Sequence, residues 1–143
     1  MNSKKGSVMT EQKLPGKNFI FVPSILSLMG VVLNVILFVP QLLTSADLDA
    51  AWPIFIPWRV WHSFVLISSA YTLFLSISGI RFCNVLEKAE FLFTLGIISI
   101  TIAGIVLIFN LIVIGINVAV LVGPLLPVLY LIGAQKNKQY RAI

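Results

Sequence analysis

Phe91–Ala134 reads FLFTLGIISITIAGIVLIFNLIVIGINVAVLVGPLLPVLYLIGA, a stretch of 44 residues without Asp, Glu, Lys, Arg or His. A single helix of that length would reach about 66 Å at ~1.5 Å per residue, roughly twice the ~30 Å hydrocarbon core of a bilayer. The stretch therefore predicts two membrane-crossing helices joined by an uncharged turn. Asn110, Gly115 and Asn117 are the turn candidates, because Asn and Gly adopt left-handed backbone angles and Asn can cap exposed backbone groups.

The composition of the whole chain agrees with a membrane protein. Of its 143 residues, 59% are hydrophobic and 10% are charged, whereas soluble domains carry about 25% charged residues. A single membrane domain fills nearly the whole sequence. The net charge of +5 would suggest a nucleic-acid partner in a soluble protein. Here the Lys and Arg residues lie in the predicted loops and tails, where they set topology, so we expect no nucleic-acid partner.

Apolar segments between polar breaks predict four spans. Pro23 falls near the first turn of the first span and Pro40 closes it, as expected for a residue that lacks a backbone N–H. A cleaved signal peptide within residues 1–46 is the alternative for this segment, but about 21 apolar residues exceed the usual 7–15. The predicted domains are a flexible basic tail at 1–18, spans at about 19–39, 60–80, 91–109 and 116–134, and a basic tail at 135–143.

The positive charges predict the orientation. Nine of the ten Lys and Arg residues fall in the two tails and the loop between the second and third spans, and only Arg59 falls on the other side. Cytoplasmic loops carry an excess of Lys and Arg. The sequence therefore predicts an all-α integral membrane protein, a bundle of four transmembrane helices with both termini in the cytoplasm. We expect it in the cytoplasmic (plasma) membrane.

Two faces of small side chains predict contacts between helices. Small residues let helices approach closely in lipid, and hydroxyl groups can hydrogen-bond across the contact. A polar pore lining is the alternative for the first face. Pro124 and Pro127 should kink or unwind the fourth span. The two faces are Ser68, Thr72 and Ser76 on the second span, and Gly115, Ala119 and Gly123 on the fourth.

An aromatic and polar cluster precedes the second span. Trp prefers the headgroup layer, and the Asp47 and Asp49 carboxylates accompany one Arg and one His there. The cluster is either a ligand or lipid contact at the outer surface, or a set of interfacial anchors. Its members are Trp52, Trp58, Arg59, Trp61 and His62.

The spans carry little that could do chemistry. Ionisable groups within a membrane usually mark ion paths or catalysis, and none lies deep in these spans. A single His and a single Cys cannot form a clustered metal site. We therefore expect no enzyme activity, no catalytic residue, no metal and no cofactor. Cys83 is interpreted as an inert interfacial residue, with lipidation or redox chemistry as alternatives, and Asn34 as an interhelical hydrogen-bonding group, with a transport role as the alternative.

The layout resembles the small four-span membrane proteins of unknown function that are widespread in bacteria, especially Gram-positive ones. The residues that carry the resemblance are Pro15-Gly16-Lys17 before the first span, and Leu125–Ala134 followed by Lys136-Asn137-Lys138. The resemblance implies the layout only, because no activity is established for that group.

Two function hypotheses follow from these patterns. The first is a non-enzymatic accessory, regulatory or immunity-type subunit that acts by helix packing with itself or with another membrane protein. The alternative is a small channel or transporter for a neutral or lipophilic solute, formed by oligomerisation around the hydroxyl face of the second span. In both cases the basic cytoplasmic surface should favour anionic lipid headgroups.

Overall fold

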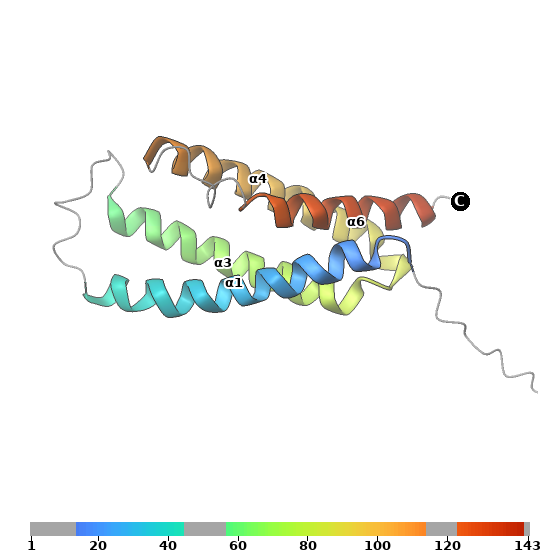
Figure 1. Ribbon diagram of the computed structural model, residues 1–143, viewed down its shortest axis with the longest axis horizontal. Helices are drawn as coiled ribbons and strands as arrows, with labels where there is room; N and C mark the ends of the chain where they lie inside the picture. Colours follow the sequence, from blue (N-terminus) through green and yellow to red (C-terminus); the bar gives the residue numbers. More distant parts are fainter. Residues whose placement is uncertain (1–13, 45–56, 114–122, 142–143) are drawn as a thin grey trace, which may run out of the picture.

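The computed structural model describes residues 14–44, 57–113 and 123–141, and this part of the chain is almost entirely helical (Figure 1). Three of its helices are long and apolar enough to cross a membrane. The predicted helical membrane fold is thereby confirmed in its coarse form. The elements are α1 (Lys17–Thr44), α3 (Trp58–Phe82), the short 3-10 helix η1 (Leu86–Lys88), α4 (Ala89–Val113) and α6 (Leu125–Arg141).

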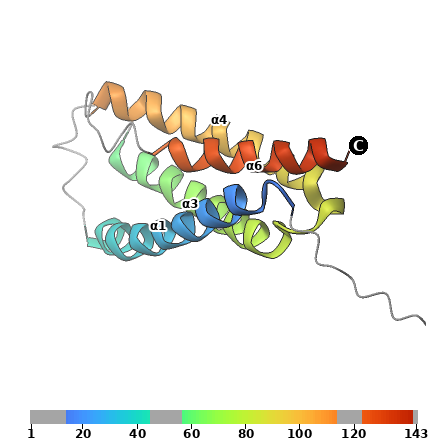
Figure 2. The same cartoon turned by 45° about the vertical axis from the view of Figure 1, so that its right-hand side comes forward.

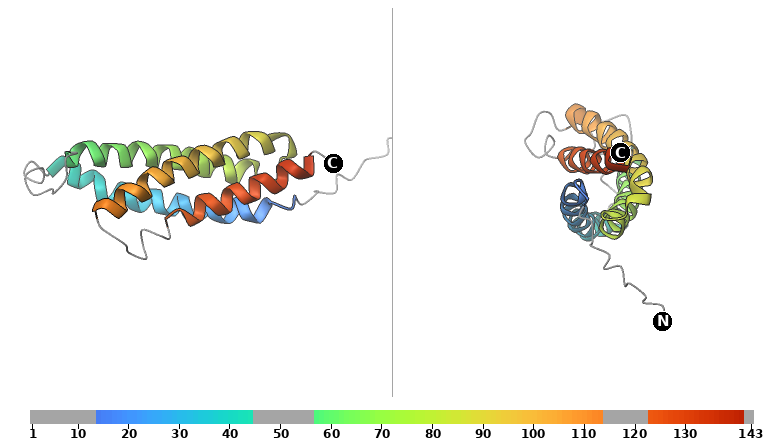
Figure 3. Two further views of the ribbon diagram at one scale, coloured as in Figure 1. Left: turned by 90° about the horizontal axis from the view of Figure 1, so that it is seen from above. Right: turned by 90° about the vertical axis from the view of Figure 1, so that its right-hand side faces the viewer.

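The four α-helices run side by side in the order α1, α6, α4 and α3 around the bundle, as the end-on view of Figure 3 shows. α1 packs closely on α3 and α6, and α4 packs on α6, while α3 and α4 touch least. The start of α1 and the end of α6 lie together at one end of the bundle (Figures 1 and 2). We call this the junction end, since α3 ends and α4 begins there as well.

The Asn137 side chain joins three segments at the junction end. Its amide is 1% exposed, and its Oδ1 accepts a 2.7 Å hydrogen bond from the backbone N–H of Gly16. Its Nδ2 donates to the carbonyl of Cys83 at 3.1 Å. Nearby, the backbone N–H of Leu14 donates to Asn84 Oδ1 at 3.2 Å. Asn137 therefore ties α6 to the start of α1 and the end of α3 with hydrogen bonds that satisfy buried backbone groups.

Glycines allow the helices to approach closely at this end. A Cβ on Gly133 would lie 2.7 Å from Phe19 Cβ and 2.9 Å from the Gly16 carbonyl oxygen. A Cβ on Gly79 would lie 2.8 Å from Cε2 of Tyr130. All three distances are below ordinary van der Waals contact, so the absence of a side chain at Gly133 and Gly79 is what lets α6 lie against α1 and α3.

A compact apolar core fills the space next to the junction. Two serines, Ser24 and Ser76, are fully buried beside it, and each donates its hydroxyl to a carbonyl of its own helix. Because each serine hydroxyl keeps a hydrogen bond, its burial leaves no polar group unpaired. The core residues are Ile20, Leu75, Cys83, Leu92, Leu95, Tyr130 and Ala134.

The first helix is longer than predicted. α1 begins at Lys17 and continues through Pro40 to Thr44, so Pro40 does not end it and Pro23 lies in its interior. The expectation for both prolines was wrong. A proline removes one N–H from the ladder, but transmembrane helices tolerate this when neighbouring helices support the chain on both sides. Pro23 is indeed buried.

The last helix differs from the predicted fourth span. α6 begins at Leu125, directly after Pro124 and with Pro127 in its first turn, where a missing N–H costs least. Its uncharged part ends at Gln135, which makes it about 16 Å long, or half of the hydrocarbon core. Residues 116–122 of the predicted span lie outside the described residues. Among the described residues, three helices are therefore candidate spans, and a fourth crossing is not shown.

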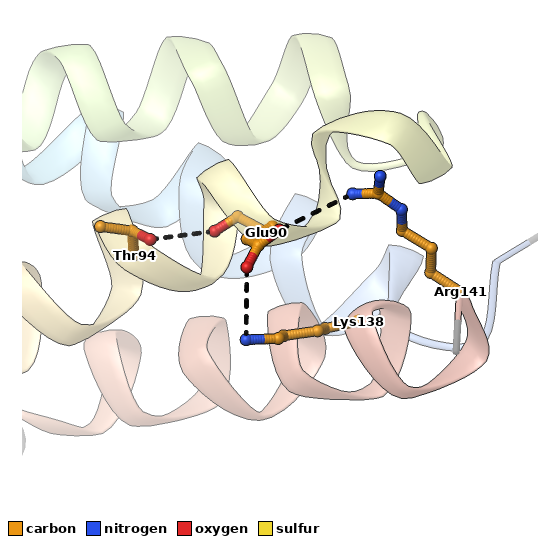
Figure 4. A network of polar contacts seen from close by, with 4 residues as sticks. All are labelled: Glu90, Thr94, Lys138 and Arg141. Atoms are coloured by element: carbon orange, nitrogen blue, oxygen red, sulfur yellow. Dashed lines mark hydrogen bonds and ion pairs between the residues drawn. The ribbon is translucent and has the colours of Figure 1, made fainter.

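The segment predicted as a basic tail is helical as far as Arg141. Lys138 Nζ and Arg141 Nη1 lie 3.8 and 3.9 Å from the carboxylate of Glu90, at the start of α4 (Figure 4). These exposed ion pairs contribute little by themselves, although each charge also lies at the favourable end of its helix dipole. The buried Asn137 in the same helical turn supplies the stronger reason for the helix to continue.

Replacing Gly133 by Ala should lower the free energy of unfolding by about 1–3 kcal/mol, because the new methyl group would overlap Phe19 and the Gly16 carbonyl. Gly30→Ala is the matched control, since a Cβ there meets nothing within 4 Å. It should leave stability unchanged or raise it, as Ala is the better helix former. Thermal unfolding of both variants in detergent checks this, and equal stability of the two would contradict the close approach.

Candidate functional site: an uncharged cavity inside the bundle

A cavity of about 380 Å³ lies among α1, α3, α4 and α6, beyond Tyr130 as seen from the junction end. Its volume falls in the range of small-molecule sites, which is about 300–1,000 Å³. None of the described residues that line it is charged. Its polar lining consists of Ser27, Asn34, Ser68, Ser69, Tyr71, Thr72, Ser99, Asn110 and Tyr130. Its apolar lining includes Leu26, Val31, Val65, Leu75, Ile102, Ala103, Val106, Leu107 and Leu126.

The cavity reaches the point in the chain where α6 begins. α1, α3 and α4 continue beyond the level of Leu125, at which α6 begins, and Gly123 and Pro124 border the cavity there. Two further small residues, Gly30 and Ala103, face the same space. A Cβ on Gly30 would meet nothing within 4 Å. Small side chains on facing helices thus leave a hollow beside the solidly packed core.

The predicted hydroxyl face of α3 is divided by the structure. Ser68 and Thr72 line the cavity, whereas Ser76 is fully buried near the junction core. The three hydroxyls donate to carbonyls four residues earlier in α3: to Phe64 at 2.8 Å, to Ser68 at 2.9 Å and to Thr72 at 2.7 Å. Their donors are thus used within the helix and do not bridge to a neighbour.

The second predicted packing face is only partly described. Gly123 lines the cavity, while Gly115 and Ala119 lie outside the described residues. Asn110, expected near a turn, instead lies inside α4 and lines the cavity. The predicted third span was therefore too short, since α4 continues to Val113.

Aromatic residues join α3 and α4 at two levels of the bundle. The Tyr71 hydroxyl donates to the carbonyl of Leu95 at 2.7 Å. At the end away from the junction, the rings of Trp61 and Phe109 stack with centroids 3.5 Å apart and an interplanar angle of 19°. The Tyr130 hydroxyl is buried and has no hydrogen-bond partner among the described residues. Its ring packs on Gly79 and forms the floor of the cavity.

The predicted outer-surface site is described only in part. Trp52, Asp47 and Asp49 lie outside the described residues, and Trp58 is the first residue of α3. Arg59 is exposed, whereas His62 is 6% exposed. Trp61 is half-buried through its stacking on Phe64 and Phe109. Of the residues of this predicted site, Arg59 therefore lies at the surface, whereas Trp61 and His62 are partly or fully buried in the bundle.

Cys83 lies in the junction core. Its thiol is 4% exposed and donates weakly to the Ile80 carbonyl at 3.5 Å. Burial raises the pKa of the Cys83 thiol, an effect that the positive charge of Lys17 partly offsets. A protonated and inaccessible thiol is a poor nucleophile. Within the described ranges, no three His, Cys, Asp or Glu side chains group in a way that could hold a metal ion.

Comparison with protein-family models, with curated proteins and with solved structures finds no match to this chain.

Because Cys83 is buried and its pKa is raised, N-ethylmaleimide should alkylate it at least about tenfold more slowly in the folded protein than in the denatured one at neutral pH. Mass spectrometry of intact protein over time measures both rates. A cysteine introduced by Ser63→Cys, at an exposed position of α3, controls for access of the reagent. Equal rates for native and denatured Cys83 would contradict its place in the core.

Proposed function

We propose that this chain is a non-enzymatic multi-pass membrane protein that holds a neutral, lipophilic molecule in the cavity between α1, α3, α4 and α6. The cavity carries the proposal, because it lies within one chain, is mostly apolar and presents no charged side chain from its described lining. A charged ligand would need a counter-charge at this depth, where an isolated ion is costly. An uncharged molecule that partitions into lipid has no such requirement.

The lining favours a lipophilic molecule over a water-filled path. The hydroxyls of Ser68, Ser69 and Thr72 donate to carbonyls of their own helix, so they present little free donor capacity. Branched apolar side chains such as Val106 and Ile102 supply much of the remaining wall. A hydrophobic solute gains about 25 cal/mol for each Å² of apolar surface that it removes from water. This supports retention of a lipid-like molecule.

This proposal develops the second of the two sequence-based hypotheses and changes one part of it. The solute would occupy the interior of one chain, and no oligomer is needed to create the space. The subunit hypothesis, with a second copy or another membrane protein as the partner, stays a prediction. Ser68, Thr72 and Gly123 turn toward the cavity, so the contact would have to use other residues.

The charge distribution supports a cytoplasmic junction end. Among the described residues, Arg59 lies at the opposite end, and six of the seven Lys and Arg residues lie at the junction end. By the positive-inside rule we propose that both termini face the cytoplasm, that the segment ending in α6 completes a fourth crossing, and that anionic headgroups surround the junction end. The plasma membrane of a bacterium is the proposed location.

Filling the cavity should displace the ligand. Ala103→Phe should lower photolabelling of cavity residues by a diazirine-bearing hexadecane about tenfold, which corresponds to about 1.4 kcal/mol of lost affinity. Ile105→Phe is the control, because Ile105 is on the same helix and is exposed on the outside of the bundle. Mass spectrometry should locate adducts at Thr72 and Val106 in the control and in the unmodified protein. Absence of adducts at cavity residues in the unmodified protein would remove the proposal.

Reporter domains fused to the two ends of the chain should both report the cytoplasm. The physical reason is that Gly16 and Asn137 are hydrogen-bonded to each other, so the two ends of the described chain lie at one membrane face. Alkaline phosphatase activity, which requires export, should be absent from both fusions. Activity of one fusion alone would contradict the topology.

A further inference from the structure

Two asparagines face the cavity from different helices. Asn34 on α1 and Asn110 on α4 both line it, and both are half-buried. Both lie in the halves of their helices that are farther from the junction: Asn110 is in the last turn of α4, and Asn34 is past the middle of α1. Tyr130 lies at the opposite end of the cavity, in the junction core. Phe109, which stacks on Trp61 of α3, directly precedes Asn110 in α4. The cavity therefore has two amide groups toward one end and an aromatic floor at the other.

Neither amide has a hydrogen-bond partner within residues 14–44, 57–113 and 123–141. An amide offers two N–H donors and an acceptor oxygen. Leaving these groups unpaired in an apolar setting is costly, whether in a protein interior or in lipid. The hydroxyls in the same wall differ, because those of Ser68 and Thr72 are already paired within α3. Unused hydrogen-bonding capacity in the cavity thus includes both amides.

We infer that Asn34 and Asn110 bind the polar group of an uncharged amphiphile, whose apolar chain extends along the cavity toward Tyr130. The polar group must both donate and accept hydrogen bonds, as a hydroxyl or an amide does, because each asparagine side chain presents both functions. A carboxylate or an ammonium group does not fit, since no described lining residue supplies an opposite charge. This inference rests on the proposed function and specifies the class of molecule that the cavity would hold.

The two amides also explain the orientation of the bound molecule. Leu75 and Tyr130 line the cavity and also belong to the apolar core, so they mark the end of the cavity nearer the junction. The Tyr71 hydroxyl is already used by the carbonyl of Leu95. An amphiphile whose polar group lies at the asparagines can hydrogen-bond to two amides, whereas at the other end it would meet the single unpaired hydroxyl of Tyr130. The larger hydrogen-bonding capacity favours the asparagine end for the polar group and the Tyr130 end for the apolar chain.

The test compares two photoreactive probes that differ in one group. Hexadecanol and hexadecane, each bearing a diazirine near the middle of the chain, are incorporated into vesicles that contain the purified protein. Adducts on cavity residues are then quantified by mass spectrometry. Asn34→Leu and Asn110→Leu should each lower labelling by hexadecanol about tenfold. Labelling by hexadecane should not change.

Two control variants and a stability measurement complete the design. Thr101→Ala, at an exposed position of α4 outside the cavity lining, should label as the unmodified protein does, because its hydroxyl bonds to the Ile97 carbonyl of its own helix. Asn34→Gln, which keeps the amide, should retain at least part of the hexadecanol labelling. Thermal unfolding of each variant shows whether it is folded, so a Leu variant that unfolds is replaced by the corresponding Ser variant, which is smaller and still lacks the amide.

The outcomes separate the inference from the proposed function. Unchanged hexadecanol labelling in both Leu variants overturns the role of the asparagines but leaves the lipophilic cavity standing if hexadecane still labels it. A loss of stability with no loss of labelling also overturns it, because the amides would then pair with each other. Absence of labelling by either probe in the unmodified protein overturns both. Rapid modification of Ser68→Cys by a membrane-impermeant thiol reagent would show a water-filled cavity and also overturns the inference.

Discussion

The hydrogen bonds of Asn137 are the interaction on which the arrangement of the helices depends. This buried amide accepts from the backbone of Gly16 and donates to the carbonyl of Cys83, so one side chain connects α6 with α1 and α3. In lipid, where apolar contact does not by itself favour one helix pairing over another, hydrogen bonds and close packing select the neighbours. The glycines on either side of the same contact allow the backbones to come near enough for these bonds to form.

The close packing of α6 at the junction end is accompanied by looser packing near the start of α6. The short α6 is held against α1 and α4 through its last turns, where Gly133, Ala134 and Asn137 are buried. Toward its start, Leu125 and Val128 are exposed, and the cavity there is lined by apolar side chains together with small and hydroxylated residues. The result is a bundle with a solid half and a hollow half. Both features that suggest function, the cavity and its two asparagines, lie in the hollow half.

Several residues show which features of the fold and of the cavity could be predicted from the sequence. The helical class and three of the spans were predictable, because long uncharged stretches have few other stable forms in a membrane. Ser68 and Thr72 were recognised as sharing a face, but a face that packs and a face that lines a cavity have the same spacing in the sequence. Asn110 was expected in a turn because Asn is frequent there, yet it lies within α4. Asn137 stood among lysines, and its burial at 1% had no signal in the local pattern.

The sequence by itself determined that this chain is an integral membrane protein built from helices, since uncharged stretches of this length must satisfy their backbone groups internally in lipid. It also determined that any interior site would lack charge, because the spans contain no ionisable group at depth. The tertiary structure alone decided which polar groups face one another. Gly16 and Asn137 are 121 residues apart, and Asn34 and Asn110 belong to separate helices that share a cavity. Periodicity defines the faces of one helix, but only packing sets which faces meet.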